Sequence, residues 1–376
     1  DTSQPERTKL FHLLKAAWPL PVDEFFPLTY PFSPTDHVFT DARVVVREDE
    51  PSSIIAFTLD SQNYREQLAN SRQSRSDAPL TELRHADASH YLYEFDTETI
   101  KLWCKIFFAE QFDALRHMCG CAEQFVQSLS RCFKWDSRGG KSGSAFLKTR
   151  DDRFVVKQLS RTELDGFSKF APQYFTYLAE CQSALRPTAL TKIFGYFRIG
   201  FKNTHTGRSF KMDFMVMENL LYGRRVDRIF DLKGSTRHRF VQESGQPHEV
   251  LQDENLMQRA QSSPLLVREH SKRILRTALH NDSLFLTEMN VMDYSLIMAL
   301  DTSRNKMVIG IIDYLRTYTW DKRVESFVKE TAILGGGGKG EPTIITPRQY
   351  RMRFLTFLDR NILMTPDPWI QSGWVQ

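Results

Sequence analysis

The sequence predicts an α+β fold of two lobes with a cleft between them. Its 376 residues, 41% of them hydrophobic, suffice for one large core or two smaller ones. Residues 89–218 contain mostly strand-like patterns with one or two helical segments, whereas residues 219–376 contain helical segments around one hairpin. Because such elements must bury their apolar faces in packed layers, we expect two lobes, and ligands bind most often between lobes of this kind.

The first 88 residues predict an N-terminal extension with a flexible linker. Prolines are scattered through residues 1–40, which favours an extended arm over packed elements. Residues 70–77 are rich in serine and arginine and contain almost no apolar side chain. A mobile linker is expected there.

The first lobe is predicted over residues 89–218. Tyr91, Tyr93 and Phe95 alternate with other residues, as in a half-buried strand. We expect Pro172 to break the helical region at 160–185 into two pieces. The other expected elements are a strand at 102–108, a helix over 112–133, and strands at 153–158, 192–201 and 210–217 with a turn at 204–207.

The second lobe is predicted over residues 219–376. Helical spacing occurs at 263–281 and at 348–361. Between them, strands beginning at Asn290 and covering 306–313 are separated by turn residues at 302–305, so an antiparallel hairpin is expected.

The charge of the chain is concentrated in one segment. A net charge of +4 does not by itself indicate a nucleic-acid partner. Residues 222–240 contain six Lys or Arg and two Asp, an excess as large as that of the whole chain. This indicates an anionic partner at one site.

Several protein classes receive no support from the sequence. Its five cysteines show no disulfide or zinc pattern, and their odd number is typical of a reducing compartment. No apolar run approaches the ~18 residues that a membrane span needs, so any membrane contact is expected to be peripheral. Because the chain begins at Asp1 rather than Met, we expect it to be part of a longer protein.

A glycine-rich turn precedes a strand that contains a lysine. Residues 139–143 read Gly-Gly-Lys-Ser-Gly, and Lys157 follows within Phe-Val-Val-Lys. Glycines let backbone amides approach phosphate oxygens, and a lysine on the next strand adds a fixed positive charge. Taken alone, the pattern fits a phosphate site and an ordinary hairpin with a surface lysine equally well. Glu163, on the following helix, is a candidate partner for Lys157.

The predicted hairpin carries an aspartate near the open end of each strand. Folding it about its turn places Asp293 opposite Asp313 or its neighbour. Two carboxylates so close repel each other unless a cation compensates, and phosphoryl transfer uses such a pair. The alternative is a pair of solvated strand-end aspartates. Because apolar residues such as Leu296 and Ile311 surround them, we expect them to be buried.

The third group lies in the basic segment, where Lys233 and Arg239 flank a Gly-Ser turn. A run of charge is most often a solvated face. Here the combination of a tight turn with two cations favours a phosphate-binding site.

Together these segments resemble the phosphatidylinositol phosphate kinases. The motifs that carry the resemblance are Asp-Leu-Lys-Gly-Ser at 231–235, Met-Asp-Tyr-Ser-Leu at 292–296 and Ile-Ile-Asp at 311–313. The resemblance extends from about residue 40 to the C-terminus. The segments similar to its type III branch, the PIKfyve-like phosphatidylinositol 3-phosphate 5-kinases, are 52–59, 104–112, 139–143, 170–175 and 313–322.

The resemblance implies a two-lobed kinase-like fold, with helices and an antiparallel sheet in the N-lobe, a smaller C-lobe and ATP in the cleft. It implies that Lys157 binds ATP, that Asp293 occupies the catalytic-loop position and that Asp313 binds Mg²⁺. A second metal ligand is not identifiable, since its expected position holds Met298. The residues implied to contact ATP are Gly140, Lys141, Ser142, Gly143, Ser144, Phe146, Lys157, Met217, Glu218, Asn219 and Leu220. Those implied to contact the lipid are Asp231, Lys233, Arg237, Arg239 and Lys339, the last within the loop at 331–347 that selects the lipid in this family.

The implied reaction moves the γ-phosphate of ATP to the 5-hydroxyl of phosphatidylinositol 3-phosphate. The implied place is the cytosolic face of endosomal or vacuolar membranes, and the family implies scaffold and phosphatase partners. A protein kinase is the nearest alternative, but the chain lacks the His-Arg-Asp and Ala-Pro-Glu motifs. A catalytically silent phosphoinositide-binding module is another, against which stand the intact Lys157, Asp293 and Asp313.

Overall fold

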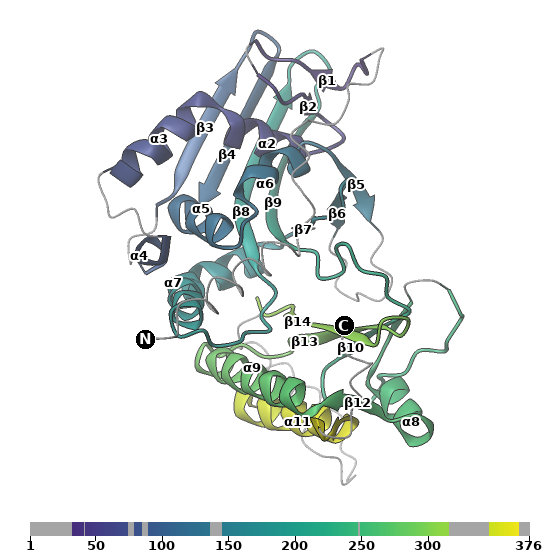
Figure 1. Cartoon of the computed structure of the whole chain (residues 1–376). Coiled ribbons are helices and arrows are strands. Elements are labelled where there is room, and N and C mark those ends of the chain that lie inside the picture. Colours follow the sequence, from purple (N-terminus) through teal and green to yellow (C-terminus); the bar gives the residue numbers. More distant parts are fainter. Residues whose placement is uncertain are drawn as a thin grey trace, which may run out of the picture. The chain divides into compact units, whose positions relative to one another are not determined.

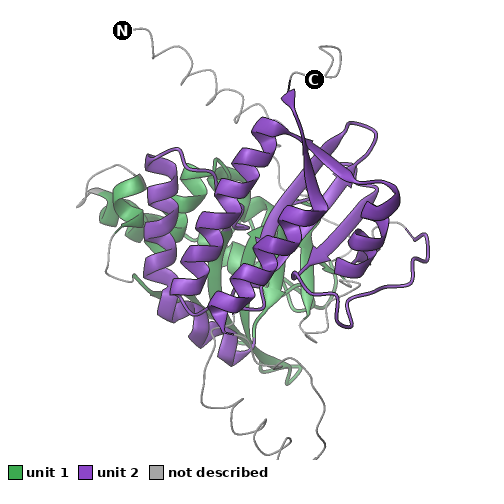
Figure 2. Ribbon diagram, turned by 90° about the horizontal axis from the view of Figure 1, so that it is seen from below, with its two compact units in different colours: residues 1–136, 144–159, 193–219 green, residues 137–143, 160–192, 220–376 purple. Residues whose placement is uncertain are grey.

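The computed structural model describes residues 32–40, 42–73, 79–84, 89–135, 145–246, 249–315 and 346–367. They form two compact units, each with its own sheet and helices (Figure 1) (Figure 2). The described residues of unit 1 fall within 1–136, 144–159 and 193–219, and those of unit 2 within 160–192 and 220–376. The predicted mixture of helices and antiparallel strands is confirmed.

Unit 1 is built on a seven-stranded antiparallel sheet with the order β3-β4-β8-β9-β7-β6-β5. Buried and exposed residues alternate at the start of β3 (Tyr91–Asp96), as predicted. The predicted turn after β8 is also present, and the Asn203 side chain accepts hydrogen bonds from the amides of His205 and Thr206. The other strands are β4 (Ile100–Phe107), β5 (Cys132–Trp135), β6 (Phe146–Thr149), β7 (Phe154–Gln158), β8 (Ile193–Asn203) and β9 (Ser209–Glu218), and a separate short sheet pairs β1 (Asp36–His37) with β2 (Val46–Arg47).

Helix α2 (Ser52–Asp60) packs against β4 and β8 of this sheet, and α5 (Ala109–Met118) packs against β8. The single helix expected over 112–133 is wrong. The chain forms α5, then α6 (Ala122–Leu129), and then enters β5. The break occurs at Gly120, whose positive φ of 69° no helix interior adopts and which glycine adopts at little cost.

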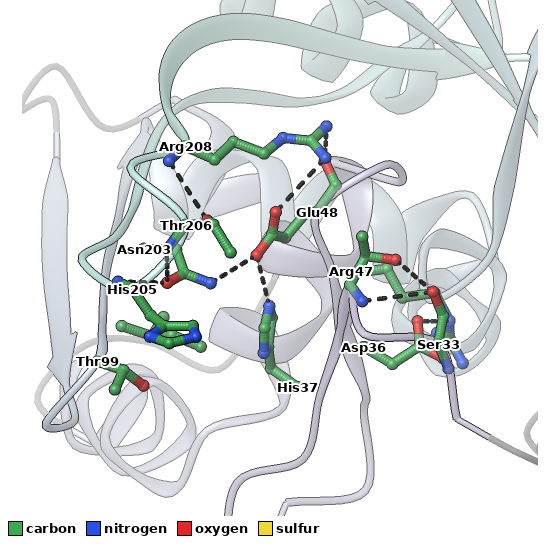
Figure 3. A network of polar contacts seen from close by, with 12 residues as sticks. Ser33, Asp36, His37, Arg47, Glu48, Thr99, Asn203, His205, Thr206 and Arg208 are labelled. Atoms are coloured by element: carbon green, nitrogen blue, oxygen red, sulfur yellow. Dashed lines mark hydrogen bonds and ion pairs between the residues drawn. The ribbon is translucent and has the colours of Figure 1, made fainter.

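The segment before α2 is packed rather than extended. Figure 3 shows the carboxylate of Glu48, only 3% exposed, at the centre of a polar network. Glu48 Oε1 lies 2.8 Å from His37 Nε2 and accepts a hydrogen bond from Asn203 Nδ2 at 3.0 Å, and Glu48 Oε2 lies 3.4 Å from Arg208 Nη1. A buried carboxylate needs such partners, so this network ties β1 and β2 to the β8–β9 turn. The extended arm is therefore wrong for 32–40, and residues 1–31 lie outside the described part.

The predicted linker at 70–77 is also wrong where the structure describes it, because residues 70–73 belong to α3 (Gln62–Gln73). Ser71 Oγ donates a hydrogen bond to Glu110 at 2.6 Å, and the Arg72 guanidinium pairs with Asp113. These contacts hold the polar end of α3 on α5. Residues 74–78 lie outside the described part, and α4 covers Pro79–Leu83.

Unit 2 contains a four-stranded sheet with the order β11-β10-β13-β14. The predicted hairpin is confirmed as β13 (Ser295–Asp301) and β14 (Lys306–Ile312), which pair antiparallel. Four further strands described in this unit were not predicted: β10 (Arg228–Leu232), β11 (Val250–Leu251), and the parallel pair β12 (Leu265–Arg268) and β15 (Ile362–Thr365).

Helix α7 (Arg161–Ser183) is continuous, so the predicted break at Pro172 is wrong. Its start is fixed by a capping box between Ser160 and Glu163. An internal proline costs a helix about 3 kcal/mol. The long buried face, which includes Phe167 and Tyr174, outweighs that local cost.

The remaining helices of unit 2 are α8 (Asp253–Ser262), α9 (Glu269–Glu288) and α11 (Pro347–Asn361). The prediction of α11 is confirmed, whereas the helix expected at 263–281 begins later, because residues 265–268 pair with β15 instead. Within the described ranges, no helix is long and apolar enough to cross a membrane.

A buried aspartate of α9 holds the segment beside β14. Asp282 accepts hydrogen bonds from the Tyr177 hydroxyl at 2.6 Å, the Thr188 hydroxyl at 2.8 Å and the Ala189 amide at 2.5 Å. The amide of Ile311 in β14 in turn donates to the carbonyl of Ala189 at 2.6 Å. The end of β14 that leads to Asp313 is thus anchored to α7 and α9.

The compact units divide the chain differently from the predicted lobes. Helices α2 and α3 belong to unit 1, although they precede residue 89, and α7 belongs to unit 2, although it precedes residue 219. The two units are defined by which residues pack together. The lobe limits of 89–218 and 219–376 stay a prediction.

Candidate active site

Strand β13 lies between β10 and β14 (Figure 1). Asp293 precedes β13 and Asp313 follows β14, so the antiparallel pairing brings both to the same end of the hairpin. The last residues that pair in the ladder are Ser295 and Ile312. Continuing this register by one residue sets Tyr294 opposite Asp313, with Asp293 one position further out. The register agrees with the predicted hairpin.

Both aspartates have a left-handed backbone, with φ 65° for Asp293 and 59° for Asp313. Non-glycine residues adopt this conformation at a cost of about 1 kcal/mol or more, and such residues cluster at functional sites. The expected burial of these side chains is wrong: the Asp293 side chain is 49% exposed, and Asp313 is exposed. The neighbouring Tyr294 and Ile311 are buried instead. Both aspartates lie beyond the last pair of the ladder.

Lys233 is the cation that contacts Asp293. Its Nζ donates hydrogen bonds to Oδ1 and to the backbone carbonyl of Asp293, both at 2.8 Å. The lysine lies in the turn after β10, whose last residues pair with the start of β13. One side chain thus neutralises Asp293 and also fixes its backbone.

The turn that contains Lys233 surrounds a carboxylate of its own. Asp253, fully buried at the start of α8, accepts hydrogen bonds from the amides of Lys233, Gly234 and Ser235 at 2.7–3.2 Å. Arg239 Nε donates to the same carboxylate at 2.8 Å, and Arg239 also pairs with Asp231. The amides of this turn therefore bind Asp253, and Arg239, which we expected at a phosphate, stabilises the turn. Asp253 was missed because nothing in the local sequence pattern distinguishes it from other helix-starting acids.

Lys157 lies in unit 1, where it is 3% exposed on β7. It pairs in the sheet with Phe146 on one side and Met215 on the other. Its Nζ lies 5.9 Å from the centre of the Phe146 ring. The burial excludes the surface-lysine alternative, because a buried ammonium is costly unless it is paired or hydrogen-bonded.

Residues 217–220 join the two units, because the chain leaves unit 1 at Asn219 and enters unit 2 at Leu220. Met217 and Glu218 end β9. Asn219 donates hydrogen bonds from its side-chain amide to the carbonyl of Asp152 and from its backbone amide to the carbonyl of Arg153, both in the loop before β7. The Leu220 methyl groups fill the space that a Cβ at Gly310 of β14 would occupy.

Several predicted site residues lie outside the described part of the chain. These are Gly140, Lys141, Ser142, Gly143, Ser144 and Lys339. Arg237 is described and exposed.

Comparison with known proteins identifies the family of this chain. The family model for phosphatidylinositol-4-phosphate 5-kinases matches residues 128–307 and 300–361. The chain belongs to this family. The motifs at 231–235, 292–296 and 311–313, around which the site is built, all lie inside the matched ranges.

Three relatives illustrate the similarity. The 1-phosphatidylinositol 3-phosphate 5-kinase FAB1 of Saccharomyces cerevisiae is 40% identical over 99% of this chain and 20% of that protein. The 1-phosphatidylinositol 3-phosphate 5-kinase of Homo sapiens is 44% identical over 80% of this chain and 14% of that protein. The 1-phosphatidylinositol-3-phosphate 5-kinase FAB1B of Arabidopsis thaliana is 40% identical over 88% of this chain and 21% of that protein. The chain thus spans about a fifth or less of each relative.

Among the described residues, the candidate ligand for Mg²⁺ is the carboxylate of Asp313 rather than a complete set of protein ligands. No group of three or more His, Cys, Asp or Glu that could hold a metal occurs among them. Mg²⁺ is commonly held by one or two carboxylates while substrate phosphates and water complete its ligands. The exposed carboxylate of Asp313 fits that mode of binding.

Proposed function

We propose that this chain transfers the γ-phosphate of ATP to the 5-hydroxyl of phosphatidylinositol 3-phosphate, giving phosphatidylinositol 3,5-bisphosphate. The observation that carries the proposal is the hairpin end, where Asp293 and Asp313 project beyond β13 and β14 and Lys233 contacts Asp293. Phosphoryl transfer needs one carboxylate beside the attacking hydroxyl and one for the metal. The choice of lipid rests on the names of the relatives.

Each residue of the site then has a role. Asp293, half exposed and held by Lys233, orients the lipid hydroxyl and accepts its proton. Asp313 holds Mg²⁺, which when bound would neutralise charge on the phosphates. Lys157, Phe146, the turn 140–144 and the segment 217–220 bind ATP.

The hydrogen bonds within the basic segment at 222–240 change our assignment of the residues that bind the lipid phosphate. Because Arg239 and Asp231 stabilise the turn and Lys233 holds Asp293, we assign headgroup binding first to the exposed Arg237 and to Lys339. We also propose that the chain acts on lipid at the cytosolic face of endosomal or vacuolar membranes, bound peripherally. A basic side chain near such an anionic surface contributes about 1 kcal/mol of attraction.

The test is a lipid kinase assay. The chain is incubated with radiolabelled ATP, Mg²⁺ and vesicles that contain phosphatidylinositol 3-phosphate, phosphatidylinositol 4-phosphate or phosphatidylinositol. We expect label in the bisphosphate formed from the 3-phosphate lipid, and a loss of about 10²–10⁴-fold in Asp293→Asn. Asp227→Asn is the matched control, since within the described residues the Asp227 carboxylate accepts hydrogen bonds from Thr302, in the turn at the other end of the hairpin.

Two results would contradict the proposal. Label in a protein substrate but in no lipid would indicate a protein kinase. Label in all three lipids at similar rates would refute the assigned substrate, though not phosphate transfer itself.

A further inference from the structure

Helix α11 contacts the segment that carries Asp293. Tyr350, 1% exposed, donates a hydrogen bond from its hydroxyl to the backbone carbonyl of Tyr294. The two rings meet edge to face, with centres 4.8 Å apart and planes at 77°. Phe354, one turn further along α11, packs against the same Tyr294 ring with centres 5.2 Å apart. Contacts of this geometry add about 1 kcal/mol each to burial.

The same helix contacts the turn that carries Lys233. A Cβ on Gly234 would lie 2.6 Å from Cα of Phe354, so only glycine allows this close approach of turn and helix. Its φ of 73° also favours glycine. One face of α11 therefore supports both the Lys233 turn and the Asp293 segment.

Two successive carbonyls beyond the last ladder pair are bound by side chains. Lys233 Nζ binds the carbonyl of Asp293, and the Tyr350 hydroxyl binds the carbonyl of Tyr294. The hydroxyl of Tyr294 itself is buried and has no partner among the described residues. Tyr294 is therefore held by its ring and its carbonyl, and these two bonds fix the peptide planes on either side of its Cα.

We infer that Tyr350 is a positioning residue, whose hydroxyl holds the Asp293–Tyr294 backbone so that the Asp293 carboxylate faces the attacking hydroxyl. This rests on the proposed function for its effect on turnover. The left-handed Asp293 backbone is not a low-energy conformation, so it persists only where its surroundings determine it. Tyr350 and Lys233 supply that constraint from opposite ends of the same two-residue segment.

The test is Tyr350→Phe, which keeps the ring packing and removes only the hydrogen bond. We expect kcat for the lipid to fall by about tenfold, while KM for ATP changes less than twofold and the melting temperature stays close to that of the parent. In hydrogen exchange, the amides of residues 293–296 should exchange faster, with other segments unchanged. Tyr93→Phe is the matched control, since it removes a buried hydroxyl that donates to Gln67 in unit 1.

The exchange measurement separates this inference from the proposed function. If the parent shows no lipid kinase activity, the proposed function fails, yet faster exchange at 293–296 in Tyr350→Phe still supports the positioning role. Unchanged exchange there, or unchanged kcat in an active enzyme, refutes it. A fall in stability with no change in kcat per folded molecule would make Tyr350 a purely structural residue.

Discussion

Asp113 in unit 1 and Asp293 in unit 2 are both paired with cations, yet their surroundings differ. The Asp113 side chain is 9% exposed and contacts Arg116, Arg72 and His117. The Asp293 side chain is 49% exposed and contacts one cation, Lys233. A buried, fully paired carboxylate cannot exchange partners without a large desolvation cost, whereas a half-exposed one can.

Both carboxylates form ion pairs, so burial, rather than the presence of an ion pair, distinguishes Asp113 from Asp293, the aspartate that we propose to be catalytic. Asp253 shows the same distinction. It binds the amide of Lys233, whose side chain binds Asp293, but Asp253 is fully buried. We therefore expect structural roles for the buried Asp113 and Asp253 and a functional role for the half-exposed Asp293.

The largest effect is expected from Asp253→Asn. Asparagine keeps one acceptor oxygen, so its NH2 group would face either the turn amides or Arg239, both of which need an acceptor. Breaking a buried pair of this kind costs about 3–5 kcal/mol, so the free energy of unfolding should fall by that amount in urea denaturation. Glu254→Gln, the next residue of α8, should change it by less than about 0.5 kcal/mol. Equal values for both variants would mean that burial does not decide the role.

Lys233→Met should affect turnover rather than stability. The variant keeps the aliphatic stem but frees the Asp293 carboxylate and carbonyl, so lipid phosphorylation should fall by about 10²–10³-fold. Because both partners are partly exposed, the melting temperature should stay within a few degrees. Lys306→Met, at the far end of the same hairpin, is the control. A large loss of stability with unchanged kcat would reverse the assignment of this pair to function.

The hairpin could be predicted from the sequence because the residues that determine it lie close together in the chain. Turn residues at 302–305 and the spacing of Asp293 and Asp313 determine the register without reference to the rest of the chain. The strand that carries Lys157 was predicted for the same reason.

The features that the sequence did not predict depend on distant partners. Strand β12 exists because it pairs with β15, almost a hundred residues later, and this delays the start of α9. The exposure of Asp293 follows from its position beyond the last ladder pair, and no local residue pattern predicts its positive φ. Tyr350 was missed because its contact with Tyr294 connects elements 56 residues apart.

The smallest effect concerns the pH dependence of the Asp113 cluster. Burial alone would raise the pKa of Asp113, but the hydrogen bond from His117 and the charges of Arg116, His117 and Arg72 outweigh it and lower the pKa to about 2. A carboxyl whose folded pKa lies below its unfolded value of about 3.9 contributes stability above that value. The contribution is lost as the pH falls from about 4 to about 2.

The expected loss is on the order of 2 kcal/mol in the free energy of unfolding of unit 1. It is measured by urea denaturation of the parent and of Asp113→Asn at several pH values between 5 and 2. The parent should lose this contribution on acidification, and the variant should lack it at every pH. Asp96→Asn is the control, because Asp96 forms a surface pair with Lys101 in which both side chains are 59% exposed, and such pairs contribute little. Parallel acid profiles for the parent and Asp113→Asn would show that the cations around Asp113 do not stabilise its ionised form, and the contrast with Asp293 would then have to rest on exposure alone.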